Sequence, residues 1–259
     1  MPELPDVEIF RRYLNATALH KKINSTEVLE KRILESPLSQ FEKLKNNSFT
    51  GTRRHGKHLF VETSGRYLLR LHFGMTGSLQ YFKRDGKLLS HARLLFNFTN
   101  GYTLAFINLR LLGHVSIEES IDEFIKRKKL GKDALEISLD EFKQISKSTT
   151  KAIKSLLMDQ NKIAGLGNIY ADEVLYQSRI HPANTSKKLK DGQIREIYRN
   201  IVEVLNYAIK HKANPNEFSK SYLLPHRSED GTCPRCNSKL KRIKISGRTS
   251  YFCPKWQKQ

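Results

Sequence analysis

The spacing of hydrophobic residues changes along the chain, and this change constrains the fold more than any other feature. Between residues 23 and 110, hydrophobic and polar residues alternate in several short runs. The clearest runs are residues 59–61, 67–73, 94–98 and 102–106. Asn100-Gly101 separates the last two runs, and this dipeptide is a strong signal for a β-hairpin. Repeated short strands with a period of two predict a β-sandwich or a barrel-like domain.

From about residue 138 the hydrophobic period becomes helical. Ile153, Leu156 and Leu157 fall on one helical face. A longer amphipathic helix is indicated by Ile194, Ile197, Ile201, Val204, Leu205 and Ala208. The charged residues 114–137 between the two parts are interpreted as a linker, which could include a short helix from 117 to 130. A chain of 259 residues is long enough for two or three domains, so we expect a strand-rich part followed by a helical part.

The charge of the chain points to a polyanionic partner. Lysine and arginine number 46 against 26 aspartate and glutamate residues, which gives a formal net charge of +20. Nucleic acid is the commonest partner of so basic a chain, and a generically basic soluble protein is the plain alternative. No apolar run approaches the ~18 residues of a membrane span, and the N-terminus lacks a signal-peptide pattern. We therefore expect a cytoplasmic protein without a membrane partner.

The first eight residues, Met1 to Glu8, combine two prolines with several carboxylates. Removal of Met1 would give Pro2 a free secondary amine, and an α-amino group has a pKa of roughly 7.7–8.0. A neutral amine can attack a carbonyl carbon and form a Schiff base, and the Glu3 carboxyl could transfer protons. The structural alternative is a proline-bounded start to a helix over residues 7–20, with Asp6 as N-cap and Val7, Phe10 and Leu14 facing the core. Both interpretations can hold together.

Two glycine-containing stretches could contact a ligand. Met75 lies between Gly74 and Gly77 in a tight loop, where an exposed thioether would suit a wedge entering a base stack. The alternative is an ordinary core methionine. Gly167-Asn168 closes a Gly-x-Gly-Asn turn before a helix, and such a turn can bind phosphate or simply form a helical corner.

The cysteines lie near the C-terminus and do not suggest a disulfide scaffold. Cys233 and Cys236 form one Cys-x2-Cys pair, but the second pair is Cys253-x2-Trp256. Four cysteines at this spacing would be a strong zinc signature. Three thiolates could still bind zinc, with water or His226 as the fourth ligand, although a structural site left open should bind it more weakly.

Together these motifs resemble those of the formamidopyrimidine-DNA glycosylase and endonuclease VIII family. The resemblance covers nearly the whole chain in family order, and the N-terminal and Gly-x-Gly-Asn motifs match best. The chain departs from the family pattern at Asp6, where glutamate is usual, and at Trp256. It also departs in the stretch 108–113, where Asn108, Leu109 and Leu112 replace an aspartate, a proline and an aromatic wedge.

The resemblance implies an α+β fold in several parts. These are an N-terminal β-sandwich with its leading helix in residues 1–113, a linker in 114–137, a helix–two-turn–helix domain in 138–225, and a zinc-finger-like β-hairpin in 226–259. The implied partner is double-stranded DNA that carries an oxidised base or an abasic site, bound by a monomer. Zinc is uncertain because the fourth cysteine is missing, and the chemistry itself needs no cofactor.

The resemblance also implies roles for individual residues. Pro2 attacks the sugar C1′, Glu3 donates a proton, Lys57 contacts phosphate and assists elimination, and Arg248 at the hairpin tip aids the second elimination. The implied DNA contacts are His72, Met75, His91, Arg110 and Asn168, and Leu112 would help Met75 and Arg110 to fill the gap left by the flipped base. The expected activity is excision of oxidised bases followed by β,δ-elimination.

Three alternatives remain open. The stretch from Asn214 to Gly231 is short, which weakens the interpretation as an 8-oxoguanine specialist and leaves an endonuclease VIII-like preference for oxidised pyrimidines. The chain could also be a DNA-binding protein that has lost catalysis. An RNA-binding protein would be supported by charge alone.

Overall fold

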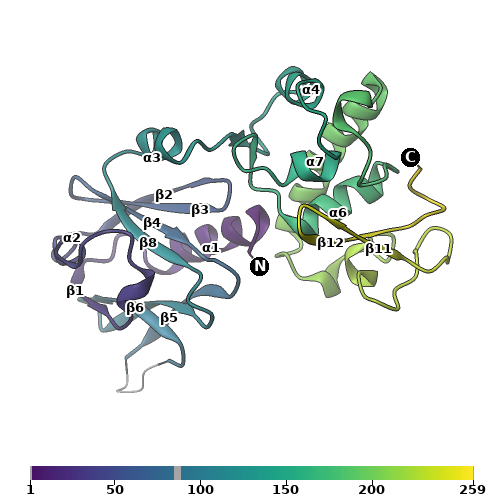
Figure 1. Cartoon of the computed structure of the whole chain (residues 1–259). Helices are drawn as coiled ribbons and strands as arrows, with labels where there is room; N and C mark the ends of the chain where they lie inside the picture. Colours follow the sequence, from purple (N-terminus) through teal and green to yellow (C-terminus); the bar gives the residue numbers. More distant parts are fainter. Residues whose placement is uncertain (1, 85–88, 259) are drawn as a thin grey trace. The chain divides into compact units, whose positions relative to one another are not determined.

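The computed structural model describes residues 2–84 and 89–258, so Met1, whose removal would free the Pro2 amine, lies outside the described residues. The chain divides into two compact units, coloured from purple to teal and from teal to yellow in Figure 1. The first contains residues 1–2 and 6–128, and the second contains residues 3–5 and 129–259. The N-terminal segment is thus divided between the units immediately after Pro2.

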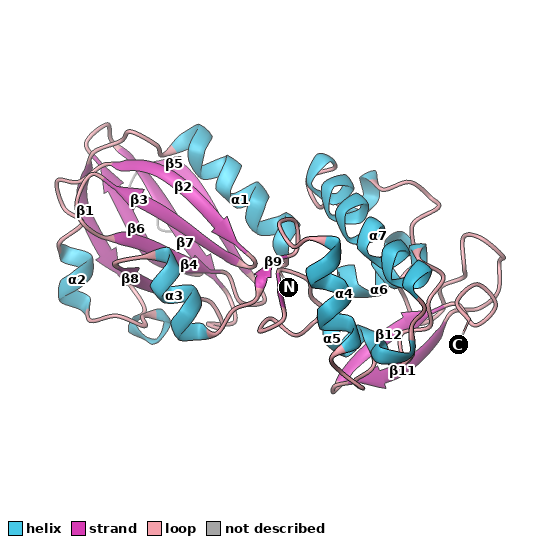
Figure 2. Ribbon diagram, turned by 90° about the horizontal axis from the view of Figure 1, so that it is seen from above, coloured by secondary structure: helices cyan, strands magenta, loops and turns pink. Residues whose placement is uncertain are grey.

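The first unit is a sandwich of two four-stranded antiparallel sheets, which confirms the predicted β-sandwich. One sheet has the order β1 (Ile23–Val28), β6 (Ala92–Phe98), β7 (Tyr102–Asn108) and β5 (Gly77–Lys83). The other has the order β2 (Phe49–His55), β3 (His58–Thr63), β4 (Leu68–His72) and β8 (His114–Glu118). Buried side chains of both sheets, such as Val61, Leu71, Phe96 and Phe106, share one hydrophobic core. Figure 2 shows the two layers.

The leading helix begins earlier than the sequence predicts. Helix α1 spans Leu4–Thr17, so Asp6 lies in its first turn and is not its N-cap. Pro5 explains the shift, because proline fits the first helical turn, where its missing N–H leaves no hydrogen bond unmade. Val7 and Leu14 are buried in the sandwich core and Phe10 packs against it, as expected.

Residues 114–137, interpreted as a linker from their charge, contain regular structure. Strand β8 pairs with β4 along its length. It is followed by α3 (Ile121–Lys128), whose buried Phe124 packs edge-on against Phe60 of β3, and by β9 (Lys132–Asp133). Phe124 stands among charged residues of a short helix, so the sequence does not identify Phe60 as its packing partner. Two short helical segments complete the unit, η1 (Lys31–Ile33) and α2 (Leu38–Glu42).

The second unit is helical with a C-terminal hairpin, as predicted. Its helices are α4 (Leu139–Lys147), α5 (Ile153–Leu157), α6 (Asn168–Gln177) and α7 (Asp191–Lys210). The six apolar residues that predict the long helix are all buried on α7. Its short elements are β10 (Ile163–Ala164), paired with β9, and the 3-10 turns η2 (Ser186–Lys188), η3 (Pro215–Glu217) and η4 (Leu224–His226). The hairpin strands are β11 (Lys241–Ile245) and β12 (Arg248–Phe252).

None of the helices within residues 2–84 and 89–258 is long and apolar enough to cross a membrane.

Candidate functional site

Glu3 is fully buried, and its carboxylate lies at the N-terminus of α6. Its oxygens accept hydrogen bonds from the backbone N–H groups of Gly167 at 2.7 Å, Ile169 at 2.9 Å and Tyr170 at 3.2 Å. The first N–H groups of a helix have no partner within the helix, and the helix dipole favours a negative charge there. Glu3 therefore joins two motifs that lie 164 residues apart in the sequence.

Gly165 makes this close approach feasible. The N–H of Leu4 donates to the carbonyl of Gly165 at 3.1 Å, and Gly165 has a φ of +122°, which side-chain-bearing residues rarely adopt. A Cβ at this position would lie 2.5 Å from Cδ1 of Leu4. The glycine thus allows the chain start to pack directly against the turn before α6.

Lys57 lies in the turn between β2 and β3, in the same unit as Pro2. Pro2 is half-buried, whereas Lys57 is only 9% exposed. Gly56 has a φ of +55°, and its carbonyl accepts a hydrogen bond from Nη1 of Arg54 at 3.2 Å. This bond closes the turn, so the Lys57 backbone is held in a defined place and does not belong to a loose solvated loop.

A buried glutamate supports this turn from α1. Glu8 receives hydrogen bonds from Arg11 and Arg12, and its Oε2 lies 3.6 Å from Nε of Arg54. Burial raises the pKa of Glu8, but the hydrogen bonds from Arg11 and Arg12 and the charges of Arg11 and Arg54 outweigh it and lower the pKa. Glu8 is therefore charged at neutral pH and orients Arg54 toward the turn.

His72 ends β4 as a neutral side chain. Burial is the main cause that lowers its pKa to about 4, and the charges of Arg70 and neighbouring cations add to the effect. Nδ1 accepts a hydrogen bond from the N–H of Gly74 at 3.3 Å, so the tautomer that fits carries its hydrogen on Nε2. His72 can thus offer one N–H donor, but not a positive charge, to an anion.

Two loops present an apolar surface beside Arg110. Met75 is 40% exposed, Leu112 is 47% exposed, and Nη1 of Arg110 lies 3.8 Å from the Met75 sulfur. Buried Asn108 connects the loops, because its side chain donates to the carbonyl of Phe73 and accepts from the N–H of Leu112, both at 3.1 Å. Met75 is therefore not a core residue, and the two stretches predicted to share a task are adjacent.

Other residues of this surface are also exposed. Leu109 is 52% exposed, more than either Met75 or Leu112. His91 is exposed with a φ of +61°, and its carbonyl accepts from the N–H of Asn108 at 3.0 Å. The backbone of His91 thus supports the loop that carries Leu109 and Arg110.

Asn168 begins α6, and a buried lysine fixes the orientation of its amide. Nζ of Lys154 on α5 lies 2.7 Å from Oδ1 of Asn168 and 2.7 Å from Oγ of Ser250 on β12. A lysine ammonium can only donate, so the Asn168 oxygen must face it. The Asn168 NH₂ group is therefore the part that remains to donate to an anion.

Lys154 belongs to a buried ionic network. Its Nζ lies 2.6 Å from Asp172 on α6, and both side chains are fully buried. Burial lowers the pKa of Lys154 and raises that of Asp172, while each charge opposes the shift of the other. Asp172 also accepts from Nε of Arg227 at 2.9 Å and from the N–H of Tyr251 at 3.1 Å. The network connects α5 and α6 to the hairpin.

Arg248 is exposed at the hairpin tip, in the position that the sequence indicates. Ser246 and Gly247 form the two-residue turn, with φ values of +49° and +74°. Oγ of Ser246 lies 2.7 Å from Oγ of Ser155, which holds the tip against α5. The tip borders a pocket of about 450 Å³, lined by Lys151, Ala152, Ser155, Met158, Asp159, Ser246 and Arg248. The pocket carries two cationic side chains, two hydroxyls and the Asp159 carboxylate, which lies 3.6 Å from Nζ of Lys151.

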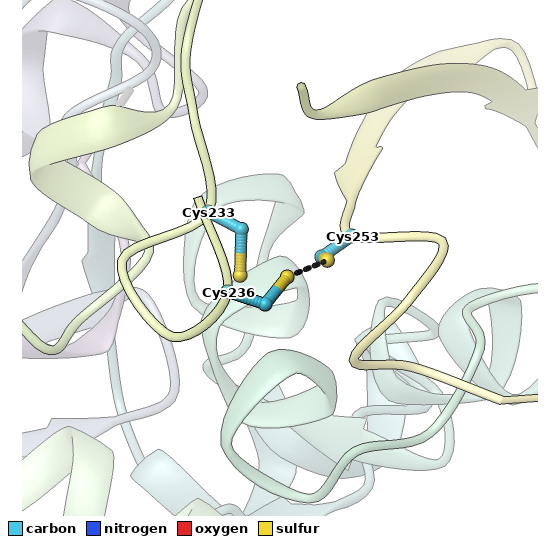
Figure 3. Close-up of side chains that lie close together, drawn as sticks. All are labelled: Cys233, Cys236 and Cys253. Atoms are coloured by element: carbon cyan, nitrogen blue, oxygen red, sulfur yellow. Dashed lines mark hydrogen bonds between the residues drawn. The ribbon is translucent and has the colours of Figure 1, made fainter. Parts of the chain in front are cut away.

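The three cysteines lie together (Figure 3), with all three sulfurs within 4.8 Å of one another. Cys233 and Cys236 come from one loop, and Cys253 follows β12. Hydrogen bonds from Ser238 lower the pKa of Cys236 to about 7, so a large fraction of this side chain is thiolate near neutral pH. Three sulfurs at these separations could hold a metal ion.

The residues present do not fit a closed four-ligand zinc site. Among the described residues, no histidine, aspartate, glutamate or further cysteine joins the three sulfurs. His226 is not part of the cluster, and its Nε2 lies 3.1 Å from the carbonyl of Lys220. Trp256 has only an indole N–H, which donates and cannot ligate a metal. A structural zinc site needs four donors, and residues 2–84 and 89–258 supply three.

Sequence reasoning missed Lys154, Asp172 and Arg227. Lys154 stands beside Ile153 in a short helical segment that also contains Ser155. A lysine at such a position is either paired or pointing out to solvent, and only the fold identifies Asp172 as its partner.

The chain matches two family models. Residues 1–115 match the formamidopyrimidine-DNA glycosylase N-terminal domain, and residues 130–219 match the formamidopyrimidine-DNA glycosylase H2TH domain. The two matches cover most of the chain and follow one another in order.

Relatives and solved structures agree with this match over the full length. The chain is 35% identical to the formamidopyrimidine-DNA glycosylase of Pelotomaculum thermopropionicum, covering all of this chain and 99% of the relative. It is 31% identical to that of Streptococcus pneumoniae, with both chains covered completely. A complex between the Lactococcus lactis Fpg and an abasic site containing DNA shares 28% identity and a TM-score of 0.91, again with complete coverage of both chains.

Proposed function

This chain belongs to the formamidopyrimidine-DNA glycosylase family, and we propose that it is a DNA glycosylase and abasic-site lyase of base excision repair. One observation supports this most directly, namely that the Glu3 carboxylate sits on the N-terminus of α6. That contact brings the residue beside Pro2 together with the Gly-x-Gly-Asn motif. We propose that the protein acts in the cytoplasm, where it associates with the DNA.

Pro2 is the proposed nucleophile. Once Met1 is removed, the neutral ring nitrogen of Pro2 attacks C1′ of the lesion nucleotide. The bond from C1′ to the base breaks, and the base leaves with a proton. The C1′–O4′ bond of the sugar then breaks, O4′ takes up a proton, and the ring nitrogen and C1′ form an iminium. The iminium makes the C2′ proton acidic, so loss of that proton expels the 3′ phosphate in β-elimination. A second elimination expels the 5′ phosphate. Water finally releases the sugar fragment and regenerates the amine.

Glu3 is proposed to transfer protons and to stabilise the opening sugar. Its three N–H partners hold the carboxylate in one place, which is what a proton-transfer group requires. Lys57, in its hydrogen-bonded turn, is the proposed phosphate contact and elimination aid.

The remaining site residues are proposed to bind DNA. Asn168 presents its NH₂ group at the start of α6, where an anion is favoured, and Arg248 presents a guanidinium at the hairpin tip. His72 contributes a neutral N–H donor. A base in duplex DNA is inaccessible to Pro2, so the nucleotide must be flipped out at a cost of a few kcal/mol. Met75, Arg110 and Leu112 are proposed to fill the space it leaves.

The relatives named above are formamidopyrimidine-DNA glycosylases, which favours oxidised purines over the endonuclease VIII-like alternative. A solved complex of a Lactococcus lactis Fpg mutant with a Fapy-dG containing DNA, 29% identical with a TM-score of 0.90, points to the same substrate class. Nicking of duplexes that carry 8-oxoguanine, formamidopyrimidine or thymine glycol would test the preference. Faster nicking of thymine glycol would favour the alternative.

Borohydride trapping tests the nucleophile. Reduction of the iminium should give a stable covalent complex with an abasic-site duplex, and a form that retains Met1 should give none, because its Pro2 nitrogen is an amide. Lys57→Ala should slow elimination, whereas Lys21→Ala, at an exposed lysine away from the site, should not. DNA binding without any trapped complex would instead indicate a protein that has lost catalysis.

A further inference from the structure

The C-terminal tail after β12 is attached to the end of α6 by contacts that need no metal. The indole N–H of Trp256 donates to the carbonyl of Tyr176 at 3.1 Å. The guanidinium of Arg179 lies 4.1 Å from the centre of the indole ring, close enough for a cation–π interaction. Trp256 also packs against the small buried cluster that contains Cys233 and Cys253.

Gln257 adds a second attachment beside Trp256. The side chain is 2% exposed; its Nε2 donates to the carbonyl of Ile180, and its Oε1 accepts from the N–H of Cys253, both at 2.9 Å. The backbone continues the contact, because the N–H of His181 donates to the carbonyl of Lys258 at 3.1 Å. The tail is thus bonded to the end of α6 and the segment after it at three successive residues.

The cysteine sulfurs also have partners within the protein. The hydroxyl of Tyr176 lies 3.2 Å from the sulfur of Cys233, and that of Ser238 lies 3.0 Å from Cys236 and 3.2 Å from Cys253. The loop that carries Cys233 is closed by its own backbone bonds, including Cys233 to Ser238 at 2.8 Å. These bonds connect the same segments that a metal ion would connect.

We propose that Trp256 replaces the fourth metal–thiolate bond as the anchor of the hairpin, so that the position of Arg248 does not depend on a bound metal ion. In a four-cysteine site, residue 256 would be connected through the metal to the loop of Cys233 and Cys236. Here it is connected to α6 instead, and α6 is the helix that begins at Asn168. A metal ion on the three remaining thiols would be an addition to a hairpin that is already fixed.

Trp256 is the only tryptophan of the chain, so its fluorescence reports on the hairpin directly. The full-length protein is treated with a strong chelator, its metal content is measured, and its emission spectrum is compared before and after. We expect an unchanged emission maximum, an unchanged thermal midpoint, and less than a twofold change in affinity for a duplex with an abasic-site analogue. A red-shifted emission together with a tenfold or greater loss of affinity on chelation would overturn the proposal.

Substitutions of Trp256 and Arg179 test how much the Trp256 contacts contribute to the hairpin, independently of metal binding. Trp256→Ala should weaken binding of the same duplex at least fivefold. Trp256→Phe keeps a ring over Arg179 but loses the N–H, so its affinity for the duplex should lie between those of Trp256→Ala and the native protein. Native affinity in Trp256→Ala would contradict the anchor. If that variant does not fold, Arg179→Met keeps the fluorophore and should make Trp256 more accessible to acrylamide. Unchanged access to acrylamide together with native affinity for the duplex in Arg179→Met would count against the proposal.

Trp256→Cys provides the matched control. It restores four thiols at zinc-ligand spacing, so it should retain one zinc ion per chain through dialysis and should lose thermal stability on chelation. The proposal would be contradicted if chelation destabilised the native protein and left the stability of Trp256→Cys unchanged. Fluorescence and unfolding do not depend on catalysis, so these results remain interpretable even if the glycosylase activity is not found.

Discussion

Gly165 is the residue on which the position of Glu3 depends most directly. Its φ is +122°, and a Cβ placed there would come within 2.5 Å of Cδ1 of Leu4, so no room is left for a side chain. Gly165→Ala should therefore displace Leu4 and destabilise the protein by about 2 kcal/mol or more, measured by urea unfolding. Base release should fall as well, since Glu3 directly precedes Leu4.

Gly192 offers the control for that substitution. It lies exposed in the first turn of α7, and nothing stands within 4 Å of the place a Cβ would take. Gly192→Ala should stabilise by about 0.5 kcal/mol, because alanine is the better helix former. Equal effects of the two substitutions would show that Gly165 is not specially constrained.

Lys154 gives a second prediction at this scale. Lys154→Met would leave Asp172 with Arg227 as its remaining charged partner and would remove the donor that orients Asn168. Breaking a buried ion pair on one side costs about 3–5 kcal/mol. We expect a loss of this size in urea unfolding, together with weaker binding of an abasic-site duplex.

Lys151 serves as the comparison three residues earlier. It is exposed, and its Nζ lies 3.6 Å from Asp159. Exposed pairs contribute about 0–1 kcal/mol, so Lys151→Met should change stability little. A small effect at Lys154 as well would mean that the buried network does not hold the unit together.

At the scale of elements, the loops that carry Met75 and Leu112 are joined, because the Asn108 side chain bonds to the backbone of both. Leu112→Ala would remove apolar surface that is proposed to fill the gap in the base stack. Excision of a damaged base should slow about tenfold, which corresponds to roughly 1.4 kcal/mol. Cleavage at an existing abasic site should be less affected, because no base has to be extruded.

The measurement is a pair of single-turnover rates, one on a lesion duplex and one on an abasic-site duplex. Leu38→Ala is a suitable control, since Leu38 is 39% exposed on α2 and has no proposed part in the site. Equal slowing of both steps by Leu112→Ala would argue for a general defect and against a wedge.

The elements themselves are largely predictable from local pattern. Period two indicates β3 and β4 of one sheet and β6 and β7 of the other, and the Asn100-Gly101 hairpin joins β6 and β7 as expected. The predicted start of α1 is wrong because Pro5 resembles a boundary, although proline also fits a first helical turn. Strand β8 is not predicted, although Val115 and Ile117 alternate with polar residues, because a run of five residues beside the charged segment that follows is too short to separate from a linker.

At the scale of the whole molecule, sequence pattern can name site residues but not their partners. Glu3 is identified from its place beside Pro2, yet its bonds to Gly167, Ile169 and Tyr170 depend on contacts 164 to 167 residues apart. Periodicity carries no information on such pairs, because it reports only which side of an element is buried. The resemblance to a known family supplies what local pattern cannot.

The largest pKa shifts among buried groups act in opposite directions in the two units, and the smaller lowering at His181 opposes the effect of Glu173 in the second. In the first unit, burial lowers the pKa of His72 to about 4 and that of His58 well below its usual value. The unfolded histidines bind protons below about pH 6.5, so this unit loses stability as pH falls from 6.5 toward 4. In the second unit, burial raises the pKa of Glu173 to about 7. The folded state then binds more protons than the unfolded state between about pH 4.5 and 7, so this unit gains stability as pH falls through that range.

Calorimetry between pH 7 and pH 5 should therefore show the unfolding of the first unit moving to lower temperature and that of the second moving to higher temperature. One pKa unit corresponds to about 1.36 kcal/mol, so the contribution of Glu173 is on the order of 2 kcal/mol over this range. Leu223 and Leu224 donate to different oxygens of Glu173, so Glu173→Gln keeps an acceptor for only one of them, but it does not titrate and should abolish the gain in the second unit alone. Hydrogen exchange can assign each transition to its unit, and a parallel shift of both units would show that other carboxylates dominate the acid response.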